Sequence, residues 1–152
     1  MTSLTSFLLF LAISVPFLVA EDFKPVTITN KFSRMPLSSR EWPSLVVGEN
    51  DNSTDFAWLI IGDMIRAYDK PLCVISKEDV NVTLDSCEVI NLELNKPYCR
   101  VTEIRPGGIF IIFTEGEQCL VDEGNVVGKY KRCRATAQER WTIEPYMGPR
   151  LE

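Results

Sequence analysis

Cysteine is the residue type whose spacing in this chain predicts chemistry most directly, and that chemistry is oxidation to disulfides. Cys73 and Cys87 lie 14 residues apart, as do Cys119 and Cys133, and the second pair follows the first at an offset of 46 residues. With the fifth cysteine, Cys99, left over, the repeated spacing favours two local loops, Cys73–Cys87 and Cys119–Cys133. Each loop stabilises the fold by roughly 3 kcal/mol in the chain-entropy model. An intermolecular disulfide through Cys99 is the alternative.

Catalytic groups are scarce. The chain has no histidine, which removes the commonest general base, the histidine-assisted nucleophiles and the commonest zinc ligand. No Cys-x-x-Cys motif and no phosphate-binding glycine loop occur. The carboxylate pairs Glu115/Glu117 and Asp122/Glu123 have the residue types of a glycosidase, but among 21 acidic residues we interpret them as solvated loop positions. We therefore predict no enzyme, no cofactor and no metal site.

The N-terminus has the pattern of an export signal. Residues 1–20 carry no charge, and the apolar run 7–19 ends at Ala20, which is typical of a signal peptide rather than a membrane span. We predict a signal peptide over 1–20 and a secreted domain over 21–152, with a short tail at about 21–25. A buried N-terminal strand or helix is the alternative.

The net charge and the composition narrow the partners. A formal net charge of −5 argues against a nucleic-acid ligand, because there is no basic excess to neutralise phosphates. Export to an oxidising compartment agrees with disulfide formation. Asn52 and Asn81 begin glycosylation sequons, which matter only in a host that modifies them.

The offset between the two cysteine loops indicates a threefold internal repeat. Trp58, Cys99 and Trp141 follow one another at steps of 41 and 42 residues, each in a strand-like segment. We predict that all three are buried core residues. The matching opening segments of the three units are 26–29, 64–68 and 109–113.

The strand pattern within the units predicts an all-β fold. The strands are short and turn residues separate them, while amphipathic helical periodicity is not evident. A unit of about 40 residues cannot bury its own apolar face, so three units must close on one shared core. We predict a β-trefoil; an ordinary β-sandwich with coincidental spacing is the alternative.

The third unit resembles the ricin-type lectin repeat. It contains Cys119-Leu-Val-Asp122, a second cysteine at 133, and Gln138-Glu-Arg-Trp141. The resemblance implies carbohydrate contacts from Asp122, Tyr130 and Gln138, which supply a carboxylate, an aromatic face and an amide. Asp122 lies one place further from the cysteine than in the typical repeat, and Gln138 lies one residue too far from Trp141. Loop and core roles for these residues are the alternative.

The whole secreted part resembles the C-subunit family of cytolethal distending toxins. The resemblance is carried by the run 140–149, by the two cysteine loops and by the degenerate ricin-like units. It implies a non-catalytic ricin B-like subunit that joins a lectin-like A subunit and a nuclease-like B subunit, and that attaches the toxin to a glycan or membrane component of the host cell. The N-terminal tail is shorter than in that family, and only 127–132 matches its loose cholesterol-recognition pattern. A stand-alone secreted lectin or a trefoil hydrolase inhibitor is the alternative function.

Overall fold

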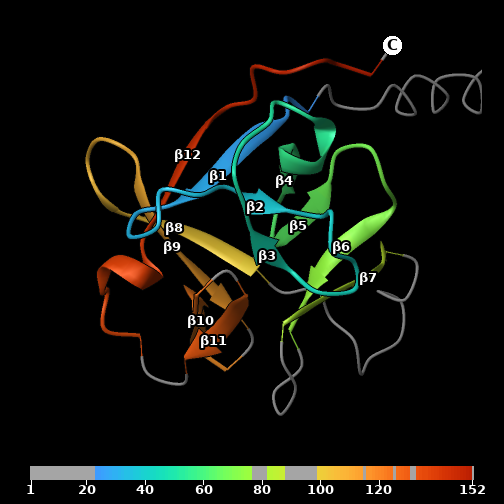
Figure 1. Ribbon diagram of the computed structural model, residues 1–152. Coiled ribbons are helices and arrows are strands. Elements are labelled where there is room, and N and C mark those ends of the chain that lie inside the picture. Colours follow the sequence, from blue (N-terminus) through green and yellow to red (C-terminus); the bar gives the residue numbers. More distant parts are fainter. Residues whose placement is uncertain are drawn as a thin grey trace, which may run out of the picture.

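The computed structural model describes residues 23–76, 82–87, 99–114, 116–124, 126–130 and 133–151, with the backbone alone for 129 and 130 (Figure 1). The predicted signal peptide, the second sequon at Asn81 and the end of the segment 127–132 lie outside these residues, whereas Asn52 is described and exposed. Within the described ranges, no helix has the length and hydropathy to cross a membrane.

The described residues form short strands and two 3-10 turns. The strands are β1 (Val26–Asn30), β2 (Leu37–Ser38), β3 (Val46–Val47), β4 (Trp58–Ile61), β5 (Met64–Ala67), β6 (Leu72–Ile75), β7 (Thr83–Ser86), β8 (Cys99–Arg105), β9 (Ile109–Thr114), β10 (Gln118–Asp122), β11 (Val127–Tyr130) and β12 (Trp141–Pro145), and the turns are η2 (Thr54–Phe56) and η4 (Ala137–Glu139).

Local sequence explains these strands and their turns. In β1, Ile28 is fully buried while Thr27 and Thr29 on the other face are half-buried, as the two-residue period of a strand requires. In the β4–β5 hairpin, Gly62 has a φ of 56°. A two-residue hairpin turn needs such a positive φ, and glycine adopts it without a steric penalty.

Six of the strands form a closed antiparallel barrel. Strand β1 pairs with β4 and β12, β4 also pairs with β5, and β9 pairs with β8 and β12. The ring closes where β8 contacts β5, and the N–H of Cys99, the first residue of β8, donates to the carbonyl of Asp63, the residue before β5, at 2.8 Å. This closure distinguishes the fold from a sandwich of two open sheets.

The other strands form three hairpins, β2–β3, β6–β7 and β10–β11, and the first of them contacts each of the other two (Figure 1). The loop after β2 reaches both neighbours, since the Leu84 N–H donates to Pro43 and the Val127 N–H donates to Leu45, each at 2.9 Å. A six-stranded barrel with three such hairpins is a β-trefoil, so the predicted fold is confirmed.

The predicted repeats are confirmed as well. The units are β1–β4, β5–β8 and β9–β12, and their last strands begin at Trp58, Cys99 and Trp141. All three residues are fully buried in the common core. The indole N–H of Trp58 donates to the carbonyl of Leu37 at 3.0 Å and that of Trp141 to Leu120 at 3.3 Å, across the same separation of 21 residues.

Both predicted disulfides are present. Cys73–Cys87 joins β6 to the residue after β7, and Cys119–Cys133 joins β10 to the chain beyond β11, each with a separation of 14 residues. Cys99 is free and buried. The first repeat has Pro36 at the equivalent of the first cysteine, as its bridge to β1 shows.

Candidate functional site

Asp122, the carboxylate proposed for a sugar in the third repeat, ends β10 and points into the protein. It is 5% exposed, and its Oδ1 accepts a hydrogen bond from the N–H of Gly124 at 3.0 Å. Such a bond is an Asx turn, which stabilises a tight chain reversal. Asp122 therefore shapes the tip of the β10–β11 hairpin, where it pairs with Val127.

The other two predicted contacts lie elsewhere in the same repeat. The backbone of Tyr130 pairs with Cys119 at the base of the hairpin, roughly 10 Å along the strand from Asp122. Gln138 is half-buried in η4, where its carbonyl accepts a hydrogen bond from Nδ2 of Asn30 at 2.8 Å. The side chain of Tyr130 lies outside the described atoms, so a sugar site built from these three residues stays a prediction.

Glu139 is a buried carboxylate that the sequence reasoning did not single out. It is 1% exposed, and its Oε2 accepts the backbone N–H groups of Arg134 at 2.8 Å and Ala135 at 3.2 Å. Its Oε1 accepts the hydroxyl proton of Thr136 at 2.7 Å. These bonds compensate the desolvation of the carboxylate, so Glu139 anchors the loop that leads to Trp141.

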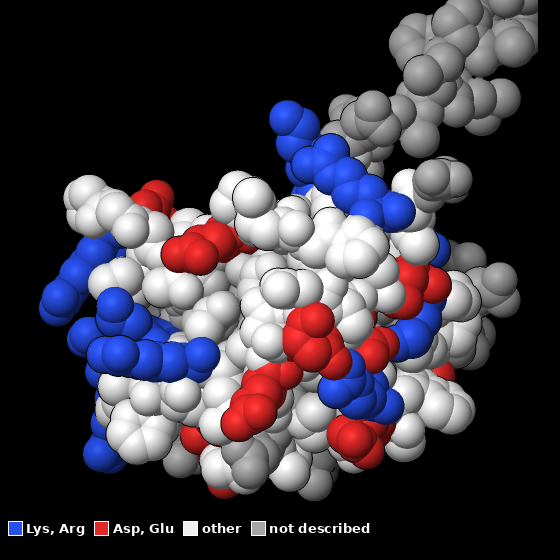
Figure 2. Space-filling model, turned by 45° about the horizontal axis from the view of Figure 1, so that its top comes forward, with Lys and Arg blue, Asp and Glu red and all other residues white. Residues whose placement is uncertain are grey.

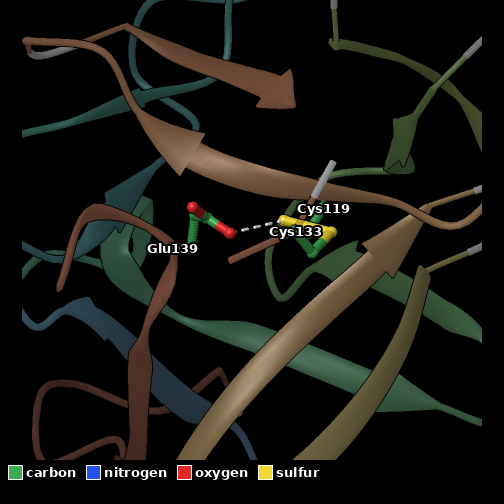
Figure 3. Close-up of side chains that lie close together, drawn as sticks. All are labelled: Cys119, Cys133 and Glu139. Atoms are coloured by element: carbon green, nitrogen blue, oxygen red, sulfur yellow. Dashed lines mark hydrogen bonds between the residues drawn. A yellow bond between two sulfur atoms is a disulfide. The ribbon is translucent and has the colours of Figure 1, made fainter. Parts of the chain in front are cut away.

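The same carboxylate lies against the Cys119–Cys133 disulfide (Figure 3). Its Oε2 is 3.1 Å from Sγ of Cys119, but a disulfide sulfur has no proton to donate, so this is a close contact rather than a hydrogen bond. The ligand atoms of Cys119, Cys133 and Glu139 lie within 4.8 Å of one another. Because metal ions bind thiolates and not disulfide sulfurs, the oxidised group is a packing contact.

In the first repeat, Ser39 and Asp55 occupy the places of Asp122 and Gln138. Ser39 follows Leu37, whose carbonyl binds the indole of Trp58, at the same separation at which Asp122 follows Leu120. Asp55 and Gln138 likewise precede Trp58 and Trp141 by the same separation. Here the two positions touch, since the Ser39 N–H donates to the carbonyl of Asp55 at 3.0 Å. Nζ of Lys70 binds both side chains, at 2.9 Å and 2.6 Å. The first repeat therefore has an ionic cluster where the third has a carboxylate and an amide.

Arg40 extends this cluster to the surface. Its guanidinium binds Asp51 and Asp55, the latter at 3.1 Å, and lies 5.4 Å from the ring centroid of Phe56. The hydrogen bond from Lys70, and then that from Arg40, lower the pKa of Asp55. The hydrogen bond from Arg40 also holds the pKa of Asp51 well below its usual range. Both carboxylates are thus ionised near neutral pH, and they fix the position of the guanidinium.

A pocket of about 460 Å³, here called the first-repeat pocket, opens beside the β2–β3 hairpin next to the ionic cluster. Pockets that hold small ligands have volumes in this range. Its walls combine apolar side chains with a hydroxyl, a guanidinium and two carboxylates. The lining residues are Met35, Ser38, Arg40, Glu41, Val46, Val47, Gly48, Glu49 and Phe56.

The rim of the first-repeat pocket offers hydrogen-bond acceptors, and an exposed tryptophan follows one of them in the chain. Glu41 and Glu49 are exposed, and neither forms an ion pair with another described residue. Trp42, the next residue after Glu41, is 58% exposed, whereas the other two tryptophans are fully buried. Carboxylates accept hydrogen bonds from hydroxyls, and an indole offers an apolar face. This combination suits a polar ligand with C–H faces.

No lectin motif marks this pocket in the sequence, because the ricin-type motif lies in the third repeat. The pocket is built around β2 and β3, which have two residues each. Strands of that length leave no periodicity in the sequence. The run Arg40-Glu41-Trp42-Pro43, with two charges and a tryptophan in one loop, was the one available signal.

Comparison with solved structures agrees with the fold. The chain superposes on the hemolytic lectin CEL-III with a TM-score of 0.66 at 17% identity, covering 80% of this chain and 32% of that one. It superposes on the designed 3-fold symmetric protein ThreeFoil with a TM-score of 0.63 at 10% identity (79% of this chain, 97% of that one). It superposes on SeviL bound to asialo-GM1 saccharide with a TM-score of 0.62 at 12% identity (82% and 99%).

These similarities establish a ricin B-like β-trefoil fold. The chain corresponds to about a third of the length of CEL-III and to nearly all of ThreeFoil and SeviL. No family model matches the sequence, and no curated protein does either.

Proposed function

We propose that this chain is a secreted, non-catalytic β-trefoil that binds neutral sugars of a glycan in the first-repeat pocket. One observation carries the proposal: a fixed guanidinium and two exposed carboxylates line a single pocket, and the residue that follows one of these carboxylates in the chain carries an exposed indole. The residues are Arg40, Glu41, Glu49 and Trp42.

The chemistry of these groups matches sugar hydroxyls. Hydroxyls donate hydrogen bonds to Glu41 and Glu49 and accept them from Arg40, while the C–H face of a sugar ring packs on Trp42. Because Asp51 and Asp55 already hold Arg40 in place, little conformational entropy is lost on binding. The two carboxylates disfavour acidic sugars. The lectin CEL-III and the saccharide complex of SeviL share the fold, which supports a glycan ligand.

The absence of histidine and the exposure of the pocket carboxylates support a role without catalysis. Cleavage of a glycoside requires one carboxyl group kept protonated by apolar surroundings. Glu41 and Glu49 are both exposed. The buried carboxylates Asp122 and Glu139 accept backbone N–H groups instead.

We further propose that the chain is a binding subunit of a secreted toxin, which pairs with a second lectin-like subunit and a nuclease-like subunit to attach the toxin to host cells and promote its delivery. The resemblance to the C-subunit family supports this assembly. Phe23, Met147 and Leu151, which are 40%, 87% and 52% exposed, lie near the two ends of the described chain and suit a partner contact. The Tyr146 N–H bound to the carbonyl of Pro25 at 3.0 Å ties these ends together. Purification from the native source is expected to yield two partner chains, one with nuclease activity; a chain that elutes alone contradicts the assembly.

The exposed loop 39–45 favours a second candidate function, inhibition of a hydrolase. Its tip displays Trp42, while Ser39 and Leu45 are buried and bound through their backbones to other segments. A loop held at both ends can present its tip to an enzyme cleft. Inhibition of a protease or glycosidase by the chain, lost in Trp42→Ala, would favour this function over sugar binding.

The sugar proposal is tested on a glycan array, followed by calorimetric titration of the neutral oligosaccharide that binds best. Trp42→Ala and Glu49→Gln are expected to weaken binding by roughly tenfold or more, since each removes a ring contact or a charge-assisted hydrogen bond. Glu144→Gln is the matched control, because Glu144 is an exposed carboxylate on β12.

Two results would overturn the assignment. One is no binding to any neutral glycan on the array. The other is binding that survives Trp42→Ala and Glu49→Gln but is lost in Asp122→Asn or Gln138→Ala, which would move the sugar to the third repeat.

A further inference from the structure

Lys31 and Arg140 are backbone neighbours just beyond the end of the β1–β12 pair. The Lys31 N–H donates to the carbonyl of Arg140 at 2.9 Å, one residue beyond the pair Asn30–Trp141. Side chains alternate faces along a strand. Asn30 and Trp141 are buried, whereas Lys31 is exposed and Arg140 is half-buried. Like charges opposite one another destabilise a sheet, so this pair gains from a bound anion.

Two further cations lie on the same sheet or in its adjoining turn, with Arg105 two strands from β12. The register across β1, β12, β9 and β8 brings Thr29, Thr142, Ile109 and Arg105 into one row. Arg34 follows Lys31 in the turn after β1. We call Lys31, Arg34, Arg105 and Arg140 the basic face. In Figure 2, Lys and Arg gather on the left, the side on which the β1–β2 turn and the β8–β9 hairpin lie in Figure 1. None of the four forms an ion pair with a carboxylate of the described chain.

The basic face borders a second pocket. This pocket has a volume of about 240 Å³, and Lys31 and Arg34 line it together with Thr29, Asn30 and Thr142. Two cationic side chains, two hydroxyls and an amide thus share one small cavity. Its chemistry differs from that of the first-repeat pocket, where carboxylates dominate the rim.

The basic face contains one buried donor without a hydrogen-bond partner in the described chain and one residue with an unfavourable backbone conformation. Nε of Arg140 is buried and has no hydrogen-bond partner within the described part of the chain. Arg34 has a φ of 59°, a left-handed conformation that costs a non-glycine residue about 1 kcal/mol or more. The fold thus keeps an arginine at a turn position that glycine would fill more easily.

We propose that the basic face binds an acidic sugar, one that carries a sulfate or carboxylate group. An oxyanion accepts charge-assisted hydrogen bonds from guanidinium and ammonium groups. Thr29 and Thr142 line the same cavity, and Phe32, in the turn between Lys31 and Arg34, is 61% exposed and offers a ring for the face of a sugar. The site shares no residue with the first-repeat pocket and does not depend on it.

The test is calorimetric titration of the full chain with a heparin-derived hexasaccharide. Lys31→Gln and Arg140→Gln are each expected to weaken binding by roughly tenfold. Lys24→Gln is the matched control, because Lys24 precedes the opposite end of β1 and is exposed; its effect is expected to stay within about twofold. An equal loss in the control would mean general charge attraction and would overturn the site.

Arg34→Gly separates binding from folding. Glycine relieves the left-handed strain at φ 59°, so the melting temperature is expected to hold or rise while hexasaccharide binding falls. Unchanged affinity in this variant contradicts a role for Arg34.

The source of the oxyanion is tested with three other probes. Phosphatidylserine vesicles, a DNA duplex and inorganic sulfate are each titrated in place of the hexasaccharide. Tighter binding of any of these would overturn the assignment to an acidic sugar. Neutral-glycan binding is expected to be unchanged in Lys31→Gln, so the failure of this site and the failure of the first-repeat pocket give different results.

Discussion

The thiol of Cys99 lies 3.9 Å from the carbonyl oxygen of Val74, in the place where the other two repeats have an indole bound to a hairpin carbonyl. Trp58 and Trp141 make the corresponding hydrogen bonds at 3.0 Å and 3.3 Å. All three side chains are fully buried. The second repeat therefore preserves the position and the polar contact with a much smaller residue.

The buried tryptophans are expected to dominate stability. Trp58→Ala and Trp141→Ala should each lower the free energy of unfolding by roughly 3–5 kcal/mol, as truncation of a buried aromatic does. Urea denaturation followed by circular dichroism measures this loss. Trp42→Ala is the control, because Trp42 is 58% exposed, and its effect should stay within about 0.5 kcal/mol. If both Trp58→Ala and Trp141→Ala lower the free energy of unfolding by less than about 1 kcal/mol, the two indoles are not core residues.

Cys99 is expected to be unreactive in the folded protein. Burial raises its pKa to about 12, so the thiolate that attacks alkylating reagents is almost absent at pH 8. Iodoacetamide should label Cys99 in denaturant and leave it unlabelled without, as mass spectrometry can show. Rapid labelling of the native chain would mean that Cys99 is accessible.

The disulfide pairing is tested by peptide mapping without reduction. Cys73–Cys87 and Cys119–Cys133 are expected as linked peptides. Replacing both cysteines of either loop by serine should cost roughly 3 kcal/mol. A peptide that links Cys99 to any other cysteine would contradict the pairing and the register of the repeats.

Acid is expected to weaken the ionic cluster of the first repeat. The pKa of Asp55 is lowered, first by the hydrogen bond from Lys70. A lowered pKa stabilises the folded state above the unfolded value of about 3.9, and this stabilisation is lost as the pH falls through the folded value. Asp55→Asn should cost on the order of 1 kcal/mol at pH 7, and the difference from wild type should shrink below about pH 4. A difference in melting temperature between the wild type and Asp55→Asn that stays the same from pH 7 to pH 3 would contradict this expectation.

Much of the fold followed from the sequence because the repeat spacing is a long-range signal. The steps from Trp58 to Cys99 and from Cys99 to Trp141 located the last strand of each unit. The repeated cysteine separation located the hairpins of the second and third units. The hairpin of the first unit left no such signal, because Pro36 stands at the cysteine position.

The candidate sites were less predictable, because they depend on contacts between distant segments. Lys31 and Arg140 become neighbours only through the register of β1 on β12. Arg40 is fixed by Asp51 and Asp55 from a loop more than ten residues away. Neither arrangement produces a periodic pattern or a local motif.

The most direct test of sugar binding uses the three indole N–H signals of the ¹⁵N-labelled chain in a nuclear magnetic resonance titration. Trp58 and Trp141 are fully buried and Trp42 is 58% exposed, so the three signals report on the core and on the first-repeat pocket separately. Addition of the neutral oligosaccharide that binds best is expected to shift the Trp42 signal with a saturating dose response and to leave the other two in place. Saturable binding that leaves the Trp42 signal unmoved would contradict the placement of the sugar beside the β2–β3 hairpin.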